Sequence, residues 1–284
     1  MANAPVQPRV ATARPVRKRG LVGRIGAYLI DIWRRVALSV AVGLMALLRM
    51  FRLHTWRPTV RQEFVRHCWQ VGIKALSATV LTASIVGFGL VYQVILFGRG
   101  EFGEAVEAFN LGTLVLLTLV REIAPLLVGL IVIGRSATVM ISELVDFRVG
   151  GQIHMLEAQG IDTFDYLVVS RTAALTVCTF SLGVIFVFVA LLAGWVMTAM
   201  SSEFSYGLVQ FLVGAARLLT PAEYLMLPLK TVGIGLLIGT VACVTALRHT
   251  AIGMDVRELV PLGFMRAVVA TLILSGAITA MVVT

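Results

Sequence analysis

The sequence LVREIAPLLVGLIVIGRSATVMISELVDFRVGGQIHMLEAQGIDTFDYLVVSR, from Leu119 to Arg171, decides the fold of this chain. An apolar helix that contains an Arg-Glu pair runs into a short, charged, amphipathic segment, and a second apolar helix begins near Tyr166. A soluble enzyme has no need of this order of segments. It is typical of a membrane protein that presents a docking surface on the cytoplasmic side of the bilayer.

The composition of the whole chain indicates an all-α integral membrane protein. Of its 284 residues, 58% are hydrophobic and 14% are charged, whereas about a quarter of the residues in a soluble domain are charged. Several apolar runs exceed the roughly 20 residues that a helix needs to cross a bilayer. Fourteen of the 24 Lys and Arg residues lie between Arg9 and Lys74, which we interpret as cytoplasmic positive charge and not as a nucleic-acid site.

The N-terminal 52 residues form two segments in this interpretation. Residues 1–20 are basic and lack an apolar core, which predicts a disordered tail and excludes a secretory signal peptide. Residues 21–52 are apolar but carry Arg34 and Arg35 near their centre, where each arginine costs about 2.5–3.5 kcal/mol inside a bilayer. We expect a helix lying in the cytoplasmic interface; a re-entrant path or a sixth span is the alternative.

Five further stretches are long enough to span the membrane: 71–97, 111–134, 166–200, 222–247 and 262–284. The charges between them predict the orientation of the chain. Three glutamates against one arginine in residues 98–109 favour an outer loop, and residues 201–221 are interpreted as a polar outer loop. Arg248, Arg257 and Arg266 indicate a cytoplasmic connection. The N-terminus is therefore expected in the cytoplasm and the C-terminus outside.

Three ionisable residues lie within the predicted spans, namely Arg121, Glu122 and Lys230. Charges at this depth face a bundle interior or a wet cavity because exposure to lipid is costly. Pro125 follows the Arg-Glu pair and frees a main-chain carbonyl. Lys230 is a plausible partner for Glu122 or for an anionic ligand. Two interpretations stay open: a polar lining for the headgroup of an amphiphile, and a structural ion cluster.

Catalytic and metal-binding patterns are missing from the sequence. None of the three lysines belongs to a phosphate-binding G-x-x-x-x-G-K-[ST] loop. The four histidines and three cysteines are scattered without metal-ligand spacing. We therefore predict no catalytic residue, no metal site and no bound cofactor in this chain.

The loop at residues 143–160 resembles a short amphipathic helix on the cytoplasmic side. Val145, Val149, Ile153 and Leu156 recur at helical spacing. Ser142 and Glu143 suit the start of this helix, Gly160 suits its end, and Gly150-Gly151 predicts a bend. Such a segment can receive motion from a soluble motor protein; the alternative is a lid that lies on the lipid surface.

These segments resemble a known family of permeases. VREIAPLLVGLIVIGRSAT, from Val120 to Thr138, is similar to the R-E-[L/I]-x-P…A-G-R-x-[G/A] core of MlaE/YrbE-type permeases, which serve lipid-transporting ABC systems that work with Mce-domain proteins. Residues 142–162 resemble the A-E-L…R-V-T-E-Q-I-D-A-L-E-x-M-G-V-D segment that follows in this family. LVVSR, from Leu167 to Arg171, resembles its L-V-x-P-R.

The resemblance implies a homodimer of permeases in a bacterial inner membrane, with the C-terminus in the periplasm. A cytoplasmic ABC ATPase would bind ATP and Mg²⁺. A periplasmic Mce-domain protein would exchange lipid, specifically phospholipid, with the dimer. By the same resemblance, lipid contacts fall to the Arg-Glu pair and to a lysine of the fourth span. The residues implied in contact with the ATPase are Glu143, Arg148, Gln152 and Glu157.

Two rival functions follow from the same residues. A stand-alone channel or secondary transporter would use Arg121, Glu122 and Lys230 as an ion path and would need no ATPase. A non-transporting scaffold would use the basic tail and the inner loop to recruit partners and would bind no substrate. The direction of transport and the class of lipid cannot be read from one permease sequence.

Overall fold

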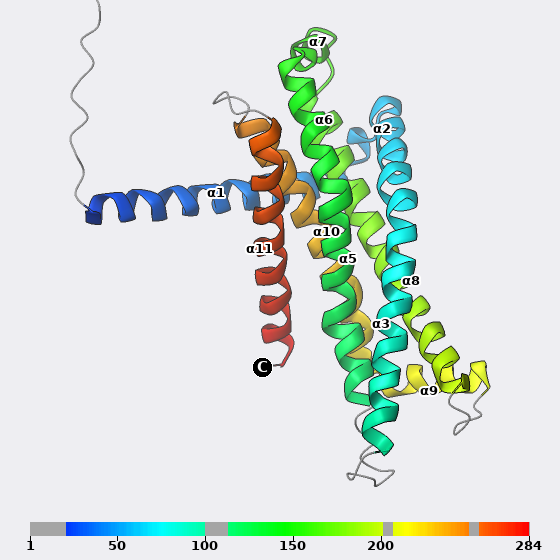
Figure 1. Ribbon diagram of the computed structural model, residues 1–284. Helices are drawn as coiled ribbons and strands as arrows, with labels where there is room; N and C mark the ends of the chain where they lie inside the picture. The colour runs from blue at the N-terminus through cyan, green and yellow to red at the C-terminus, as the bar shows by residue number, and fades with distance from the viewer. Residues whose placement is uncertain (1–20, 100–112, 201–206, 250–255, 284) are drawn as a thin grey trace, which may run out of the picture. The chain divides into compact units, whose positions relative to one another are not determined.

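The computed structural model describes residues 21–99, 113–200, 207–249 and 256–283. Within these ranges the chain is helical and has no strand (Figure 1). Five stretches are long and apolar enough to cross a membrane: Pro58–Leu96, Thr113–Val149, Phe164–Met200, Glu223–Leu247 and Arg257–Met281. The predicted five-span, all-α fold is confirmed. The predicted tail at residues 1–20 and most of the first outer loop lie outside the described residues.

The N-terminal helix α1 runs from Leu21 to Met50, close to the predicted 21–52. Among the described residues, 21–38 belong to one compact unit and the chain from Ser39 onward belongs to another, and each is considered by itself. The apolar part of α1, Val36–Met50, is 15 residues long by its bounds, about 22 Å of helix. That length is short of the roughly 30 Å of a hydrocarbon core. It agrees better with an interfacial helix than with a sixth span.

The first span begins earlier than predicted. After the short 3₁₀ turn η1 (Leu53–Thr55), α2 (Pro58–Cys68) continues through the π-helical turn η2 (Trp69–Ile73) into α3 (Lys74–Arg99). The helix therefore includes the polar residues 58–67, ahead of the predicted start of the span at residue 71. Proline is compatible with the first turn of a helix, where its missing N–H has no partner to lose, and here it begins the helix.

The second span also extends further than predicted. Helical residues 113–118 continue through η3 (Leu119–Ile123), α5 (Ala124–Val132), η4 (Ile133–Ala137) and α6 (Thr138–Val149) without a break. The expected helix start at Ser142 and Glu143 was wrong, because the Ser142 hydroxyl donates to the main-chain oxygen of Thr138 inside α6.

The predicted bend at Gly150-Gly151 is present. The φ angle of Gly151 is +69°, a left-handed conformation that glycine adopts without strain. The short helix α7 (Gln152–Ala158) follows, and Gly160, with a φ of +72°, closes it. The predicted apolar stripe is therefore divided between two helices, with Val145 and Val149 in α6 and Ile153 and Leu156 in α7. Val145 is buried, whereas Val149 is exposed just before the bend.

The third span consists of η5 (Phe164–Val169) and α8 (Ser170–Met200). The predicted polar loop at 201–221 was wrong in its second half, which forms α9 (Leu208–Leu218). Leu208, Phe211, Leu212 and Ala215 occur at the spacing of one helix face, a pattern that favours an amphipathic helix over a loop. The last two spans are α10 (Pro221–His249) and α11 (Val256–Val283).

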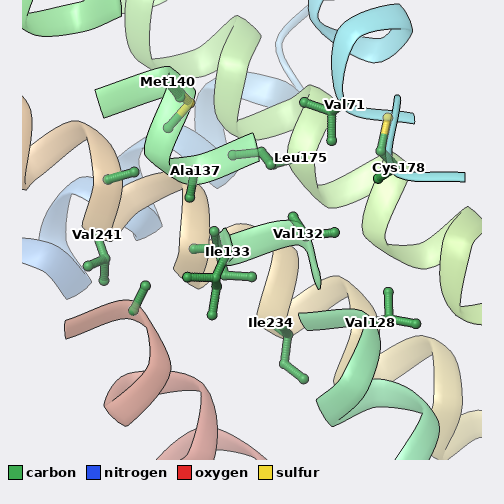
Figure 2. Packing of buried hydrophobic residues seen from close by; sticks show 14 of the residues in the cluster. Val71, Val128, Val132, Ile133, Ala137, Met140, Leu175, Cys178, Ile234 and Val241 are labelled. Atoms are coloured by element: carbon green, nitrogen blue, oxygen red, sulfur yellow. The ribbon is translucent and has the colours of Figure 1, made fainter. Parts of the chain in front are cut away.

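The long helix α8 packs against α3 and α10 (Figure 1). A Cβ atom at Gly235 of α10 would lie 2.7 Å from Cα of Thr176, and one at Gly239 would lie 2.9 Å from Cα of Thr172. This Gly-x-x-x-Gly pair thus allows close backbone contact between α8 and α10. Figure 2 shows the apolar core around the second span, in which Val128 and Val132 lie among residues of α8 and α10.

Candidate functional site

Two of the three intramembrane charges, Glu122 and Lys230, meet in one polar cluster. The Lys230 ammonium nitrogen lies 2.7 Å from Oε1 of Glu122, as the sequence interpretation allowed. Two hydroxyl groups of α11 complete the cluster: Thr279 donates to Glu122 Oε1, and Ser275 donates to Glu122 Oε2 at 3.3 Å. The sequence interpretation missed both hydroxyls, although their spacing of four residues places them on one face of the last helix.

Pro125 explains why the Lys230 ammonium group lies beside the second span. A proline has no N–H to donate to the carbonyl four residues earlier, which is that of Arg121. The freed oxygen accepts a hydrogen bond of 2.7 Å from Lys230 Nζ. Lys230 also donates to Glu122, at 2.7 Å, and to Thr279 Oγ1, at 2.5 Å. An ammonium group has three N–H donors, so all three are used.

The side chain of Arg121 is not part of this set. Its contribution to the cluster is its main-chain oxygen, and its Nε is buried without an acceptor among the described residues. Lys230 is completely buried. The contacts favour a structural ion cluster for Glu122 and Lys230, while a role of the three residues in lipid binding stays a prediction.

A large apolar cavity lies at the end of the bundle opposite α7. Its volume is about 500 Å³, and residues of α3, the start of the second span, α8 and α9 line it. The lining is almost wholly apolar and includes Leu90, Val94, Leu116 and Phe211. Leu119, which also lines it, is two residues from Arg121. A volume of this size is typical of pockets that hold small amphiphiles. The sequence interpretation missed the cavity because it depends on the unpredicted helix α9.

The four residues implied in contact with an ATPase fall into two groups. Gln152 and Glu157 are exposed on α7. Glu143 and Arg148 lie on α6 and make contacts within the fold: Gln70 donates to Glu143 Oε1 at 2.9 Å, and Arg148 donates to the main-chain oxygen of Leu247. The geometry leaves α7 as the accessible part of the segment.

Glu143 also belongs to a buried cluster around Arg171. Only 1% of the Arg171 side chain is exposed. Its Nε donates to His67 Nε2 at 2.9 Å, and its Nη2 lies 3.8 Å from a carboxylate oxygen of Glu63 and of Glu143. The guanidinium carbon is 5.3 Å from the centre of the Phe147 ring. This cluster joins α2, α6 and α8, and the sequence interpretation assigned no role to Arg171, Glu63 or His67.

A second ionic contact connects the end of α1 with the segment after α7. Arg49 Nη1 lies 2.7 Å from Asp165 Oδ1 and 2.9 Å from Asp162 Oδ2, and its guanidinium carbon is 4.9 Å from the centre of the Phe164 ring. Hydrogen bonds to Asp165 and then to Asp162 raise the pKa of Arg49. Burial acts to raise the pKa of Asp162, but hydrogen bonds from Arg49 and from the Phe164 N–H outweigh it and lower that pKa.

Comparisons with known proteins agree with this architecture. The family model described as Permease MlaE matches residues 64–282. The chloroplastic protein TRIGALACTOSYLDIACYLGLYCEROL 1 of Arabidopsis thaliana is 25% identical over 221 residues, which are 75% of this chain and 57% of that protein. The chain therefore spans little more than half the length of this relative.

A second relative is nearer in length. The probable ABC transporter permease protein ycf63 of Porphyra purpurea is 25% identical over 208 residues, 72% of this chain and 74% of that protein. The family model covers all five candidate spans except the first residues of one, and it contains the Glu122–Lys230 cluster and, apart from Glu63, the cluster around Arg171. The chain therefore belongs to the MlaE permease family and is a multi-pass membrane permease subunit of the ABC-transporter type.

Proposed function

We propose that the chain moves lipid, and specifically phospholipid, between a bacterial inner membrane and a periplasmic Mce-domain partner. Two copies form the permease, and a separate cytoplasmic ATPase that binds ATP and Mg²⁺ drives them. The observation that carries the lipid assignment is the apolar cavity of about 500 Å³ between α3, α8 and α9. A hydrated ion finds no ligands in such a lining, whereas acyl chains bury apolar surface against it.

The name of one relative supports lipid as the substrate class. The Arabidopsis relative is named after trigalactosyldiacylglycerol, a lipid with two acyl chains. An amphiphile of this kind needs an apolar cavity for its chains and a polar region for its headgroup. The Arg121 side chain, half-buried two residues from cavity-lining Leu119, is the candidate headgroup contact.

The exposed position of α7 supports binding of an ATPase at the end of the bundle opposite the apolar cavity. Gln152 and Glu157 are exposed on this short helix, which is held between Gly151 and Gly160 at the end of the long second helix. A push on α7 can therefore move the second span, and with it Glu122. Since the second span contributes Leu116 and Leu119 to the cavity wall, the same motion changes the shape of the cavity.

The test is a variant that fills the cavity. Gly214 of α9 lines the cavity, and a Cβ atom there would meet nothing within 4 Å. Gly214→Leu should therefore fold normally, place its side chain in the cavity and lower both the lipid retained on purification and the rate of lipid transfer between vesicles. Ala216→Leu is the matched control, because Ala216 is exposed on the same helix and does not line the cavity.

The assay uses the chain purified with its own ATPase and outer partner, and mass spectrometry of the retained lipid. Equal lipid retention and transfer by Gly214→Leu and Ala216→Leu would contradict the proposed cavity. A wild-type chain that purifies alone and without lipid, yet conducts ions down a gradient, would favour a channel. A chain with partners but neither lipid nor flux would favour a scaffold.

A further inference from the structure

A second, smaller pocket on the α7 side of the bundle has a different chemistry. Its volume is about 120 Å³, and it lies where η2, η4 and the start of α8 converge. Val71, Met140 and Leu175, which are labelled in Figure 2, supply the apolar part of its lining. Lys74 and Arg135 supply two cationic side chains, both exposed.

Neither of these cations is neutralised by the fold. Lys74 and Arg135 have no side-chain hydrogen bond or ion pair with any of the described residues. Arg171 is a third cation of the lining. It is buried, and its Nη1 has no hydrogen-bond partner among the described residues. The one carboxylate among the lining residues, Glu143, is engaged by Gln70 and lies near Arg171. The pocket therefore has an excess of positive charge and unused N–H donors.

The surroundings of these cations have features of a membrane–water interface. Lys74 begins α3, which is apolar along most of its length, and Arg135 lies in η4 directly after the apolar helix α5. Ile73, Leu76 and Val139 are exposed beside them, so the pocket borders an apolar surface. Trp69, one turn before Ile73, is 67% exposed, and tryptophan is enriched at the membrane–water interface.

We propose that this pocket binds the phosphate group of an anionic lipid from the leaflet on the α7 side. The volume is enough for one phosphate group. Lys74 and Arg135 donate to its oxygens, Ser136 offers a hydroxyl at the wall, and the acyl chains lie outside against Ile73, Leu76 and Val139. This site is distinct from the 500 Å³ cavity, with which it shares no lining residue. The inference needs the membrane location of the chain but not the proposed transport.

The experiment measures lipid preference without an ATPase. The chain is placed in nanodiscs of equimolar phosphatidylglycerol and phosphatidylcholine, and native mass spectrometry counts the lipids that stay bound. The wild-type chain should retain phosphatidylglycerol in preference to phosphatidylcholine. Each cation near anionic lipid contributes about fivefold. Lys74→Gln combined with Arg135→Gln should therefore reduce the preference by about 25-fold.

Two further variants serve as controls. Arg57→Gln combined with Arg61→Gln removes two exposed cations of the same region that do not line the pocket, and should leave the preference unchanged. Lys74→Arg combined with Arg135→Lys retains both charges and should retain most of the preference. This pair also shows that a loss in the glutamine variant comes from charge and not from misfolding.

Three results would overturn the proposal. The first is equal retention of the two lipids by the wild-type chain, or an unchanged preference in the glutamine variant. The second is displacement of phosphatidylglycerol by millimolar inorganic phosphate, which would make this a site for free phosphate. The third is an unchanged lipid preference in the glutamine variant together with loss of the ATPase in a separate purification of the whole complex, which would make it a protein-docking site. None of these results bears on whether Gly214→Leu blocks transfer.

Discussion

Lys230 Nζ lies 2.7 Å from the main-chain oxygen of Arg121, the carbonyl that Pro125 leaves without its helical donor. A main-chain hydrogen bond that one helix lacks is thus replaced by a bond from a side chain of another helix, and the same ammonium group neutralises Glu122. The π-helical turn η3 contains both Arg121 and Glu122. The ion pair therefore stabilises a local irregularity of the second span, in addition to joining α10 to it.

Replacing Lys230 by Met should destabilise the protein strongly. The substitution removes the positive partner of Glu122 and the side-chain donor to the Arg121 carbonyl, and breaking one side of a buried ion pair costs about 3–5 kcal/mol. Thermal unfolding in detergent measures the loss. Lys230→Met combined with Glu122→Gln removes both charges and should recover part of it. Wild-type stability of Lys230→Met, with weaker lipid binding, would instead show that the lysine serves the substrate.

Arg171 should not tolerate replacement by Lys. A lysine keeps the charge but offers no planar fork that bonds His67 while facing Glu63 and Glu143. We expect Arg171→Lys to lower the free energy of unfolding by about 2 kcal/mol or more, measured by denaturation in mixed micelles. The exposed Arg57→Lys is the control and should be neutral. Equal stability of the two variants would show that charge alone suffices at Arg171.

Gly235 should be sensitive to a single added methyl group. The new Cβ would lie 2.7 Å from Cα of Thr176, so α8 and α10 would have to separate. Overpacking of this kind costs about 1–3 kcal/mol. Gly276→Ala provides the matched control, because a Cβ there meets nothing within 4 Å, and a helical Gly→Ala change in open space is neutral or stabilising. Melting temperatures of the two variants test this prediction. Equal melting temperatures would contradict the close contact between α8 and α10.

The Arg49–Asp162 contact should make the free energy of unfolding depend on pH in the acidic range. The folded pKa of Asp162 is lowered, so the unfolded chain binds a proton at higher pH than the folded chain does. The contribution is fully present above the unfolded pKa of about 3.9 and is lost as the pH falls through the lower, folded pKa. Since Asp162 is half-exposed, the effect should be at most about 1 kcal/mol.

Melting temperatures between pH 6 and pH 3 test this dependence. Asp162→Asn removes the titrating group, so its melting temperature should fall less over this range than that of the wild-type chain. His154→Gln, an exposed change on α7, should leave the wild-type slope intact. Parallel curves for Asp162→Asn and the wild-type chain would show that the contact adds nothing to stability.

Sequence reasoning located all five spans, and Glu122 was one of the two partners that it allowed for Lys230. Long apolar runs leave few alternatives to a spanning helix, and a charge inside such a run must find a partner. The ends of the helices were less predictable. The polar residues Pro58–His67 resemble loop sequence, yet they form the start of the first spanning helix. Glu143–Val149, expected in a separate short helix, instead form the end of the second spanning helix.

The clusters that depend on distant contacts were beyond the sequence. Glu63, Glu143 and Arg171 are each unremarkable in their local sequence, and their meeting depends on how α2, α6 and α8 pack. The cavity likewise needs α9, whose apolar face occurs in a stretch that begins with polar residues. Helical spacing from Leu208 to Ala215 is the local pattern that predicts this helix.

The unbroken second helix has a mechanical consequence. From Thr113 to Val149 it has 37 residues, about 55 Å of length, against a hydrocarbon thickness of about 30 Å. Its end carries α7, and the Glu122–Lys230 pair lies about 40 Å from that end. A rotation of 10° about this pivot moves the tip by about 7 Å. By this geometry, a displacement of a few ångströms at α7 would correspond to a small change of helix tilt beside the apolar cavity.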